Sequence, residues 1–285
     1  MERGRATKFW QGRLLTAGVM SFLAVAHVPA SEASPISCGQ VLGPGGSFSL
    51  DSPLTGCSGT AVVVKSAELN LNGHTVTCGS GSDTGIRIEG SGSRVTNGTI
   101  TGCGFGVDVA GSGGHHVEKV TATDNTTGFV VTTGGDNDLL QNTATDCDYG
   151  FVVQVDNNRL SANTAAGNVV SYVINGGNGN DLTDNTAKDS ELGFQISSSS
   201  TALSGNTAAG NRYGFVVPAG GNELTDNVAT SNRSGITVPS GGEGNRLRSN
   251  AASGNAVVDV TDENACGRNE WQANTFGFAS EACIR

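Results

Sequence analysis

Few residues of this sequence have the type and spacing that bind metals or catalyse reactions. His115 and His116 form the only pair of adjacent histidines, and imidazole is a common metal ligand. Neighbouring side chains on a strand point to opposite faces, so this pair is a poor bidentate ligand. The segment Gly176–Asp184, GGNGNDLTD, has the composition of a nine-residue calcium-binding repeat, but it occurs once and its apolar residue stands one place early. We interpret both features as turn residues and predict no metal site and no cofactor.

Two tyrosines offer a different kind of site. Tyr149 and Tyr213 each stand directly before a Gly-Phe pair, so equivalent positions of the chain present an aromatic ring. An exposed aromatic ring packs well against the apolar face of a sugar. Two interpretations stay open for these residues: a platform for carbohydrate, and ordinary packing within a turn.

The element that positions these residues is a repeat. A phrase of 21 or 22 residues recurs five times between Gly128 and Ser234, beginning GFVV, GFVV, SYVI, GFQI and GFVV. Weaker copies begin at Gly85, Gly106, Gly235 and Val257. A fixed period in this range is the signature of a solenoid, in which each unit buries its apolar face against its neighbours.

Each repeat contains two short apolar runs separated by Gly, Asn, Asp, Ser and Thr, which predicts short strands and no helix. Stacking the repeats at about 4.8 Å per coil brings equivalent residues into columns. We expect one aromatic and one leucine column to fill the core: Phe129, Phe151, Tyr172, Phe194 and Phe215; and Leu139, Leu160, Leu182, Leu203, Leu224 and Leu247.

Three further columns consist mainly of asparagine. Their members are Asn142, Asn163, Asn185, Asn206, Asn227 and Asn250 in the first; Asn137, Asn158, Asn180, Thr201, Asn222 and Asn245 in the second; and Asn125, Cys147, Asn168, Ser190, Asn211, Asn232 and Asn255 in the third. Asparagine tolerates the left-handed backbone of tight turns, and stacked amides hydrogen-bond to one another. We interpret these columns as structural ladders at the turns.

These features together predict an all-β fold, a right-handed parallel β-helix of about ten coils of 21–22 residues. A leucine-rich repeat needs several leucines per unit, where this sequence has one or two. A hexapeptide helix needs a six-residue period, which this sequence lacks, and a propeller blade is about twice as long as the repeat.

The pattern GF-x-V…N-x-L-x-x-N…N and the leading segment Leu69–Ile100 resemble secreted right-handed β-helix proteins of the pectate-lyase-like superfamily. Within that superfamily they resemble the repeats shared by carbohydrate-binding proteins, sugar hydrolases and the periplasmic NosD protein. The likeness covers about residues 37–285. It implies the coil, but the same fold carries many functions. The likeness to NosD does not bring a copper site. The only methionines are Met1 and Met20, which lie in the N-terminal segment that we expect to be removed on export, and the rest of the chain has three histidines.

The first 33 residues have the order of an export signal. Four basic residues precede or border the apolar stretch Leu14–Val28, and small residues suited to cleavage end at Ala30 and Ala33. We expect an exported protein, periplasmic, secreted or at the cell surface, without membrane insertion after signal removal; an uncleaved anchor is the alternative. The predicted organisation is a signal peptide at 1–33, an N-terminal capping segment with the first coils at 34–84, β-helix repeats at 85–256, and a C-terminal coil and cap at 257–285.

Seven cysteines in an exported protein predict disulfides with one thiol left over. Cys147 lies two coils from Cys103, roughly 9.6 Å at the coil spacing, so we expect it to stay reduced. The predicted disulfides bracket the two terminal segments or join adjacent coils: Cys38–Cys57, Cys266–Cys283 and Cys78–Cys103.

In the last segment, Trp271, Phe276 and Phe278 are expected to plug the open end of the core.

The charge balance limits the partners. The chain has 16 Lys and Arg against 26 Asp and Glu; residues 1–30 hold four basic and one acidic residue, so 12 and 25 remain beyond them, a net charge of −13. This surface disfavours nucleic acid and anionic membranes. It also suits polyanionic pectin or alginate poorly, unless calcium bridges the carboxylates.

Enzymes of the superfamily place clustered carboxylates, with Arg or Lys, on an outward strand face. In this sequence the outward position of the first strand has one carboxylate and no basic residue; it reads Asp108, Val130, Val152, Val173, Gln195, Val216 and Thr237.

The valines in this column form an apolar strip on the outward face. Such a strip needs a cover, namely a tail, a second subunit or a ligand, and Pro35–Val64 is our candidate tail.

We therefore expect an exported, non-catalytic β-helix module that recognises polysaccharide or serves as a structural spacer at the cell surface. No catalytic, cofactor-binding or metal-binding residue is predicted. The alternative is a polysaccharide lyase or glycoside hydrolase whose site lies on loops. An exposed carboxylate cluster in a groove would favour the enzyme, and exposed tyrosines would favour binding.

Overall fold

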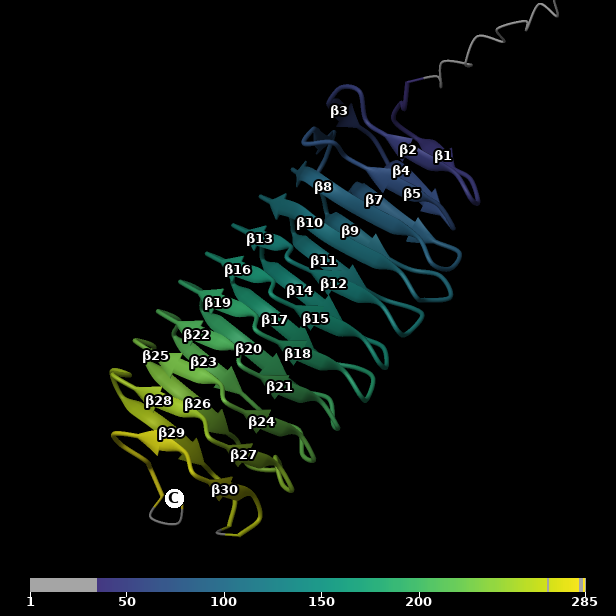
Figure 1. The fold of residues 1–285 in the computed structure, drawn as a ribbon. Coiled ribbons are helices and arrows are strands. Elements are labelled where there is room, and N and C mark those ends of the chain that lie inside the picture. Colours follow the sequence, from purple (N-terminus) through teal and green to yellow (C-terminus); the bar gives the residue numbers. More distant parts are fainter. Residues whose placement is uncertain (1–34, 266, 282–283, 285) are drawn as a thin grey trace, which may run out of the picture. The chain divides into compact units, whose positions relative to one another are not determined.

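The computed structural model describes residues 35–265, 267–281 and 284, which form thirty-one strands and no helix. The strands wind into a right-handed parallel β-helix of eleven coils (Figure 1), so the predicted fold is confirmed with one coil more than expected. The predicted signal peptide and the Cys266–Cys283 disulfide lie outside the described residues. Within the described ranges, no helix reaches the length and apolarity that a membrane span requires.

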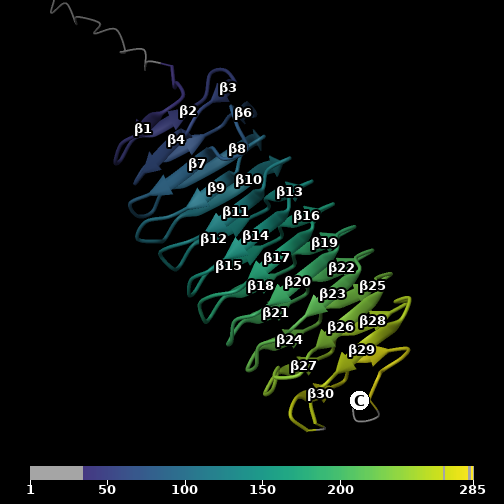
Figure 2. The same ribbon diagram turned by 180° about the vertical axis from the view of Figure 1, so that it is seen from behind.

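One strand from each coil forms a parallel sheet of eleven strands, which we call sheet A (Figure 2). Its register keeps equivalent repeat positions opposite each other, as at Phe129 and Phe151. The strands are, in spatial order, β1 (Gln40–Leu42), β4 (Thr60–Lys65), β7 (Thr84–Glu89), β9 (Phe105–Val109), β11 (Thr127–Val131), β14 (Tyr149–Val153), β17 (Val170–Ile174), β20 (Leu192–Ile196), β23 (Tyr213–Val216), β26 (Ser234–Val238) and β29 (Val258–Asp262).

The rest of each coil contributes one long strand or two short ones, which again pair in parallel with the coils before and after. Two coils carry the long strands β8 (Arg94–Thr101) and β10 (His116–Thr123). The other coils carry β2 (Ser47–Ser49), β3 (Leu54–Cys57), β5 (Glu68–Asn70), β6 (Thr75–Cys78), β12 (Asp138–Leu140), β13 (Thr143–Thr145), β15 (Arg159–Ser161), β16 (Thr164–Ala166), β18 (Asp181–Thr183), β19 (Thr186–Lys188), β21 (Ala202–Ser204), β22 (Thr207–Ala209), β24 (Glu223–Thr225), β25 (Val228–Thr230), β27 (Arg246–Arg248), β28 (Ala251–Ser253), β30 (Glu270–Gln272) and β31 (Thr275–Phe276).

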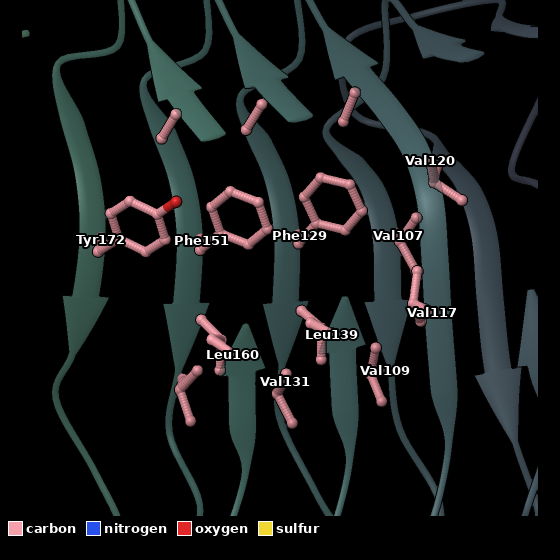
Figure 3. Close-up of a cluster of buried hydrophobic side chains, with 14 of the residues drawn as sticks. Val107, Val109, Val117, Val120, Phe129, Val131, Leu139, Phe151, Leu160 and Tyr172 are labelled. Carbon is pink, nitrogen blue, oxygen red and sulfur yellow. The ribbon is translucent and has the colours of Figure 1, made fainter. Parts of the chain in front are cut away.

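The two predicted core columns are present. Five aromatic rings stack from Phe129 to Phe215 with centroids 4.6–5.0 Å apart and nearly parallel planes. Figure 3 shows Phe129, Phe151 and Tyr172 in this stack, with Leu139 and Leu160 of the leucine column below them. Both columns are fully buried. Because each coil buries its side chains mainly against the coils before and after, the regular 21–22-residue spacing is enough to build this core.

The first asparagine column forms a continuous ladder of hydrogen bonds. Asn163 is typical: its N–H and its Nδ2 both donate to Asn185 Oδ1, at 2.9 and 3.0 Å, and Nδ2 also donates to the carbonyl oxygen of Leu139 at 2.8 Å. The ladder asparagines are buried, so these bonds satisfy polar groups that water cannot reach. The prediction of structural ladders is confirmed, and the column continues one step further, to Asn274.

The left-handed backbone conformation, however, does not fall on the ladder asparagines. It falls on the residue before each of them, as at Ala162 (φ 54°) before Asn163 and Asp184 (φ 56°) before Asn185. One left-handed residue turns the chain sharply, and the following side chain then points into the solenoid. Expecting the asparagines themselves to adopt this conformation was therefore wrong.

The C-terminal end of the core is partly closed by two of the three predicted aromatic residues. Trp271 lies opposite Leu247 and Phe276 opposite Ala252, so they extend two interior columns and pack against the core. Phe278 is 59% exposed, and the prediction for it was wrong. Its N–H donates to Asp259, a bond that holds the backbone at the coil end while the ring faces solvent.

Two of the predicted disulfides are present. Cys38 bonds to Cys57 and Cys78 to Cys103, with Cα–Cα distances of 5.4 and 5.1 Å. Cys147 is a buried free thiol, as expected from its two-coil separation from Cys103.

Candidate functional site

The outward valines form the floor of a groove on the outer face of sheet A. Val130, Val152 and Val173 lie side by side on β11, β14 and β17. Although they face outward, Val130 and Val173 are only 5% and 6% exposed, because neighbouring side chains rise beside them. The groove measures about 260 Å³, and none of its eight lining residues is charged.

The two walls of this groove differ in chemistry. One wall holds Phe105, Thr127 and Tyr149, the first residues of three consecutive strands. Phe105 and Tyr149 are 41% and 43% exposed and lie two coils apart, about 9.6 Å at the usual strand spacing. The other wall holds the amides of Gln154 and Asn175. Such a groove suits an uncharged ligand that presents both C–H faces and hydroxyl groups.

The segment Pro35–Val64 does not cover these valines. Its strand β1 pairs with β4 and extends sheet A beyond β7, so the segment belongs to the first coils of the stack. The expectation that this segment covers the valines was wrong, because its apolar residues are used to continue the core: Leu42, Leu50 and Leu54 are buried there.

A charged cluster stands at the N-terminal end of the groove floor. Asp108 lies opposite Arg87 on one side and opposite Val130 on the other. Arg87 donates from Nε to Glu89 Oε1 at 2.9 Å and from Nη1 to Asp108 Oδ2. Thr132 Oγ1 donates to Asp108 Oδ1 at 3.3 Å. We call Arg87, Glu89 and Asp108 the groove-end cluster.

Asp108 is a buried carboxylate with a perturbed pKa. Burial raises the pKa of Asp108 above its usual value, and Glu89 adds to this effect, whereas Arg87 and the hydrogen bond from Thr132 oppose it. A carboxyl group of this kind beside a guanidinium is chemically suited to hydrogen bonding or proton transfer.

The outward column read from the sequence began at Asp108 and therefore contained no basic residue. The structure extends this column toward the N-terminus, first to Arg87 and then to Val63 and Val41. The sequence contained the evidence for this position of Arg87. The weaker repeat that begins at Gly85 places Arg87 where the repeat at Gly106 places Asp108. The statement that this strand face lacks a basic residue was thus wrong.

The structure separates the two candidate tyrosines. Tyr149 lines the groove, whereas Tyr213 stands three strands further along the same wall column, after Val170 and Leu192. The Arg212 guanidinium lies 5.3 Å from the Tyr213 ring centroid, close enough for a cation–π contact. Tyr149 is therefore the tyrosine available to a ligand in the groove.

The histidines serve local structure. His115 begins the second asparagine column: its N–H donates to Asn137 Oδ1 and its Nδ1 accepts from the Ser93 N–H. His116 Nε2 lies 3.3 Å from Glu118 Oε2. Across the part of the chain that the structure describes, no three His, Cys, Asp or Glu side chains converge as metal ligands would.

The calcium-repeat-like segment Gly176–Asp184 also supplies turn residues. Asn180 stands in the second asparagine column, where its Oδ1 accepts from the N–H of Asn158 at 2.8 Å. Asp184 adopts the left-handed conformation described above.

Solved structures share this fold at low sequence identity. The periplasmic alginate epimerase AlgG has a TM-score of 0.54 and 16% identity, over 71% of this chain and 59% of that chain. The A-module of the Azotobacter vinelandii mannuronan C-5 epimerase AlgE6 has a TM-score of 0.57 and 14% identity, over 84% and 79%. A pectate lyase has a TM-score of 0.56 and 16% identity, over 87% and 74%. These similarities show a shared fold, and this chain spans under two thirds of the first structure.

Comparison of the sequence with protein families identifies the chain more specifically than comparison of the folds. No curated protein matches the chain, but the family described as "Periplasmic copper-binding protein (NosD)" matches residues 50–187 and 110–278, which together span most of it. Every strand of sheet A except β1 lies within these matches, and so do the asparagine ladders. The chain belongs to the NosD family, and its parallel β-helix is similar in fold to a pectate lyase.

Proposed function

We propose that this protein is an exported, non-catalytic module that binds an extended polysaccharide chain in the groove of sheet A. The observation that carries the proposal is the groove itself, with its apolar floor of valines, exposed rings of Phe105 and Tyr149, and amides of Gln154 and Asn175. Sugars present C–H faces that pack on aromatic rings and hydroxyl groups that hydrogen-bond to amides.

Two further observations support this proposal. The structures with the same fold are named for enzymes of alginate, mannuronan and pectate, which supports a polysaccharide ligand by analogy of fold. Two disulfides and membership of a family described as periplasmic support export.

The family description also implies copper, and the residues present do not fit a copper centre. Copper sites use His, Cys and Met ligands. Methionine occurs only at Met1 and Met20, no three His, Cys, Asp or Glu side chains converge among the described residues, and Cys147 is buried. Burial raises the pKa of the Cys147 thiol, which disfavours the thiolate that a metal needs. We therefore assign copper no part in the proposed function.

A glycan array that carries neutral and acidic oligosaccharides tests the proposal. We expect binding that Tyr149→Ala weakens about 5- to 10-fold, since one lost aromatic platform costs roughly 1–1.5 kcal/mol, and that Tyr149→Phe largely retains. Tyr213→Ala is the matched control and should change little. An array without any bound glycan, or binding that is indifferent to Tyr149→Ala, would contradict the proposal.

A second candidate function, a polysaccharide lyase or glycoside hydrolase, is favoured by Asp108. Its carboxyl group is buried, has a raised pKa and pairs with Arg87, features common to general acids and bases. Absorbance of unsaturated products and a reducing-sugar assay over a polysaccharide panel decide between the functions. Turnover that Asp108→Asn abolishes would establish the enzyme in place of the binding module.

A further inference from the structure

Resting on the proposed carbohydrate binding, we propose that the groove selects neutral, two-fold extended β-1,4-linked glycans over polyuronates, and that the groove-end cluster of Arg87, Glu89 and Asp108 is its hydroxyl-binding subsite. Three observations carry this inference: the way Arg87 is held, the charge along the groove, and the spacing of its two exposed rings.

The guanidinium of Arg87 is held by two carboxylates and keeps further N–H groups that a ligand can use. Its five N–H groups include one that bonds to Glu89 and one that bonds to Asp108, and its side chain is 41% exposed. Two carboxylates therefore orient the remaining donors before a ligand arrives, which lowers the entropy cost of binding. Arg87 bonds to Glu89 Oε1, and the partly exposed Glu89 leaves its Oε2 as an acceptor beside these donors, without a hydrogen bond from another described residue. A hydroxyl group, which both donates and accepts, matches this pair.

The charges near the groove disfavour a polyanion. The groove lining is uncharged, and within the groove-end cluster two carboxylates face one guanidinium. Lys65 lies opposite Glu89, so the local cations only balance the local carboxylates. A polyuronate would bring one carboxylate per sugar to a surface without compensating charge, on a chain whose net charge beyond residue 30 is −13. Like charges across an interface reduce affinity.

The spacing of the exposed rings favours a particular chain geometry. Phe105 and Tyr149 occupy the same wall column two coils apart, about 9.6 Å. In a two-fold extended β-1,4-linked chain, each sugar advances by about one coil spacing and alternate sugars present the same face. Rings two coils apart therefore meet the same face of two alternate sugars when the chain runs along the solenoid axis. The sugar on Phe105 lies in the coil of Asp108, because both residues belong to β9, and the next sugar along this path reaches the coil of Arg87.

Isothermal titration calorimetry on the signal-free protein tests the inference with two matched ligand pairs: β-1,4-mannohexaose against β-1,4-hexamannuronate, and cellohexaose against β-1,4-hexaglucuronate. Within each pair the ligands differ at the C6 carboxylate. EDTA in a low-salt buffer removes bridging calcium. We expect at least one neutral hexamer to bind about 10-fold or more tightly than its acidic counterpart.

Variants of the groove-end cluster locate the subsite. We expect Arg87→Lys to weaken binding of the neutral hexamer about 10-fold, because lysine keeps a cation beside Asp108 but lacks the planar fork of donors. Glu89→Gln should also weaken it, and a thermal melt verifies that each variant is folded. Arg212→Gln, directly before β23 and beyond the groove, is the control that should bind like the wild type.

The outcomes separate the two proposals. Equal or tighter binding of both uronates, or neutral binding that survives Arg87→Lys and Glu89→Gln but is lost in Tyr149→Ala, would overturn this inference and leave the proposed function standing. The absence of binding to all four hexamers, together with an empty glycan array, would overturn both.

Discussion

Asn185 and Asn206 are joined by two hydrogen bonds that converge on one oxygen. The Asn185 N–H and its Nδ2 donate to Asn206 Oδ1 at 2.9 and 3.0 Å, and the same Nδ2 donates to the carbonyl oxygen of Leu160 at 2.8 Å. Both side chains are fully buried. Each rung of the ladder thus ties the turn of one coil to the coils on both sides.

Asn185→Ala should therefore destabilise the fold. The substitution removes the amide bonds, leaves the buried Asn163 N–H without its acceptor and leaves Asn163 Nδ2 with the carbonyl oxygen of Leu139 alone, so we expect a loss of about 1–3 kcal/mol in the free energy of unfolding. Urea denaturation monitored by circular dichroism measures it. Asn274→Ala, at the partly exposed end of the same ladder, should cost less, and negligible losses at both sites would show that the ladder contributes little.

Ala162→Gly should stabilise the protein. Ala162 is held at φ 54°, a left-handed conformation that costs a residue with a Cβ roughly 1–2 kcal/mol and that glycine adopts freely at a smaller entropy cost. We expect a gain of about 0.5–1 kcal/mol in thermal or urea unfolding. Ala166→Gly in the neighbouring strand β16 is the control and should destabilise; a loss of stability at both positions would contradict this account.

Asp259 should make stability depend on pH at the C-terminal end. Burial would raise the pKa of this carboxyl group, but hydrogen bonds from Asn255, Phe278 and Gly277 outweigh it and lower the pKa below its usual value of 3.8. A lowered folded-state pKa stabilises the protein above the usual value, and this contribution is lost as the pH falls through the folded-state pKa.

We therefore expect Asp259→Asn to reduce the free energy of unfolding near neutral pH, by about 1–3 kcal/mol for the acceptors removed. The difference from the wild type should shrink below pH 3.8. Urea titrations between pH 2 and 7 would check this. A difference that stays constant across that range would show that the charge of Asp259 is irrelevant.

The cysteines should react in two classes. Cys147 is buried and burial raises the pKa of its thiol, so iodoacetamide should label it only after denaturation. Non-reducing peptide mapping should find Cys38–Cys57 and Cys78–Cys103, and it also tests the predicted Cys266–Cys283 pair. A peptide that joins Cys103 to Cys147 would show that the register of the coils is wrong.

Val152→Trp should block the groove without unfolding the protein. Val152 is a partly exposed outward residue in the middle of the floor, so a large side chain has room to extend over the groove. We expect glycan affinity to fall about 10-fold or more with an unchanged melting temperature. Unimpaired binding would place the ligand elsewhere on the protein.

The periodicity of the sequence determined the coils, the stacked core and the asparagine ladders. In a parallel solenoid each residue meets its equivalents in the coils before and after, so Phe129 must lie opposite Phe151 once the 22-residue spacing is read. Contacts of this kind depend on the repeat alone, which is why Cys147 could be assigned as the free thiol without coordinates.

Features that depend on distances between columns were decided only by the tertiary structure. The near burial of Val130, although it faces outward, results from the height of the walls beside it, and the pairing of Arg87 with Asp108 joins two of the weaker repeats, which begin at Gly85 and Gly106. The left-handed residue falls at Ala162 and not at Asn163, because the backbone must turn before the amide can point inward. A one-dimensional repeat specifies which residues are stacked, whereas the shape and chemistry of a surface groove arise from side chains of different columns packed beside one another.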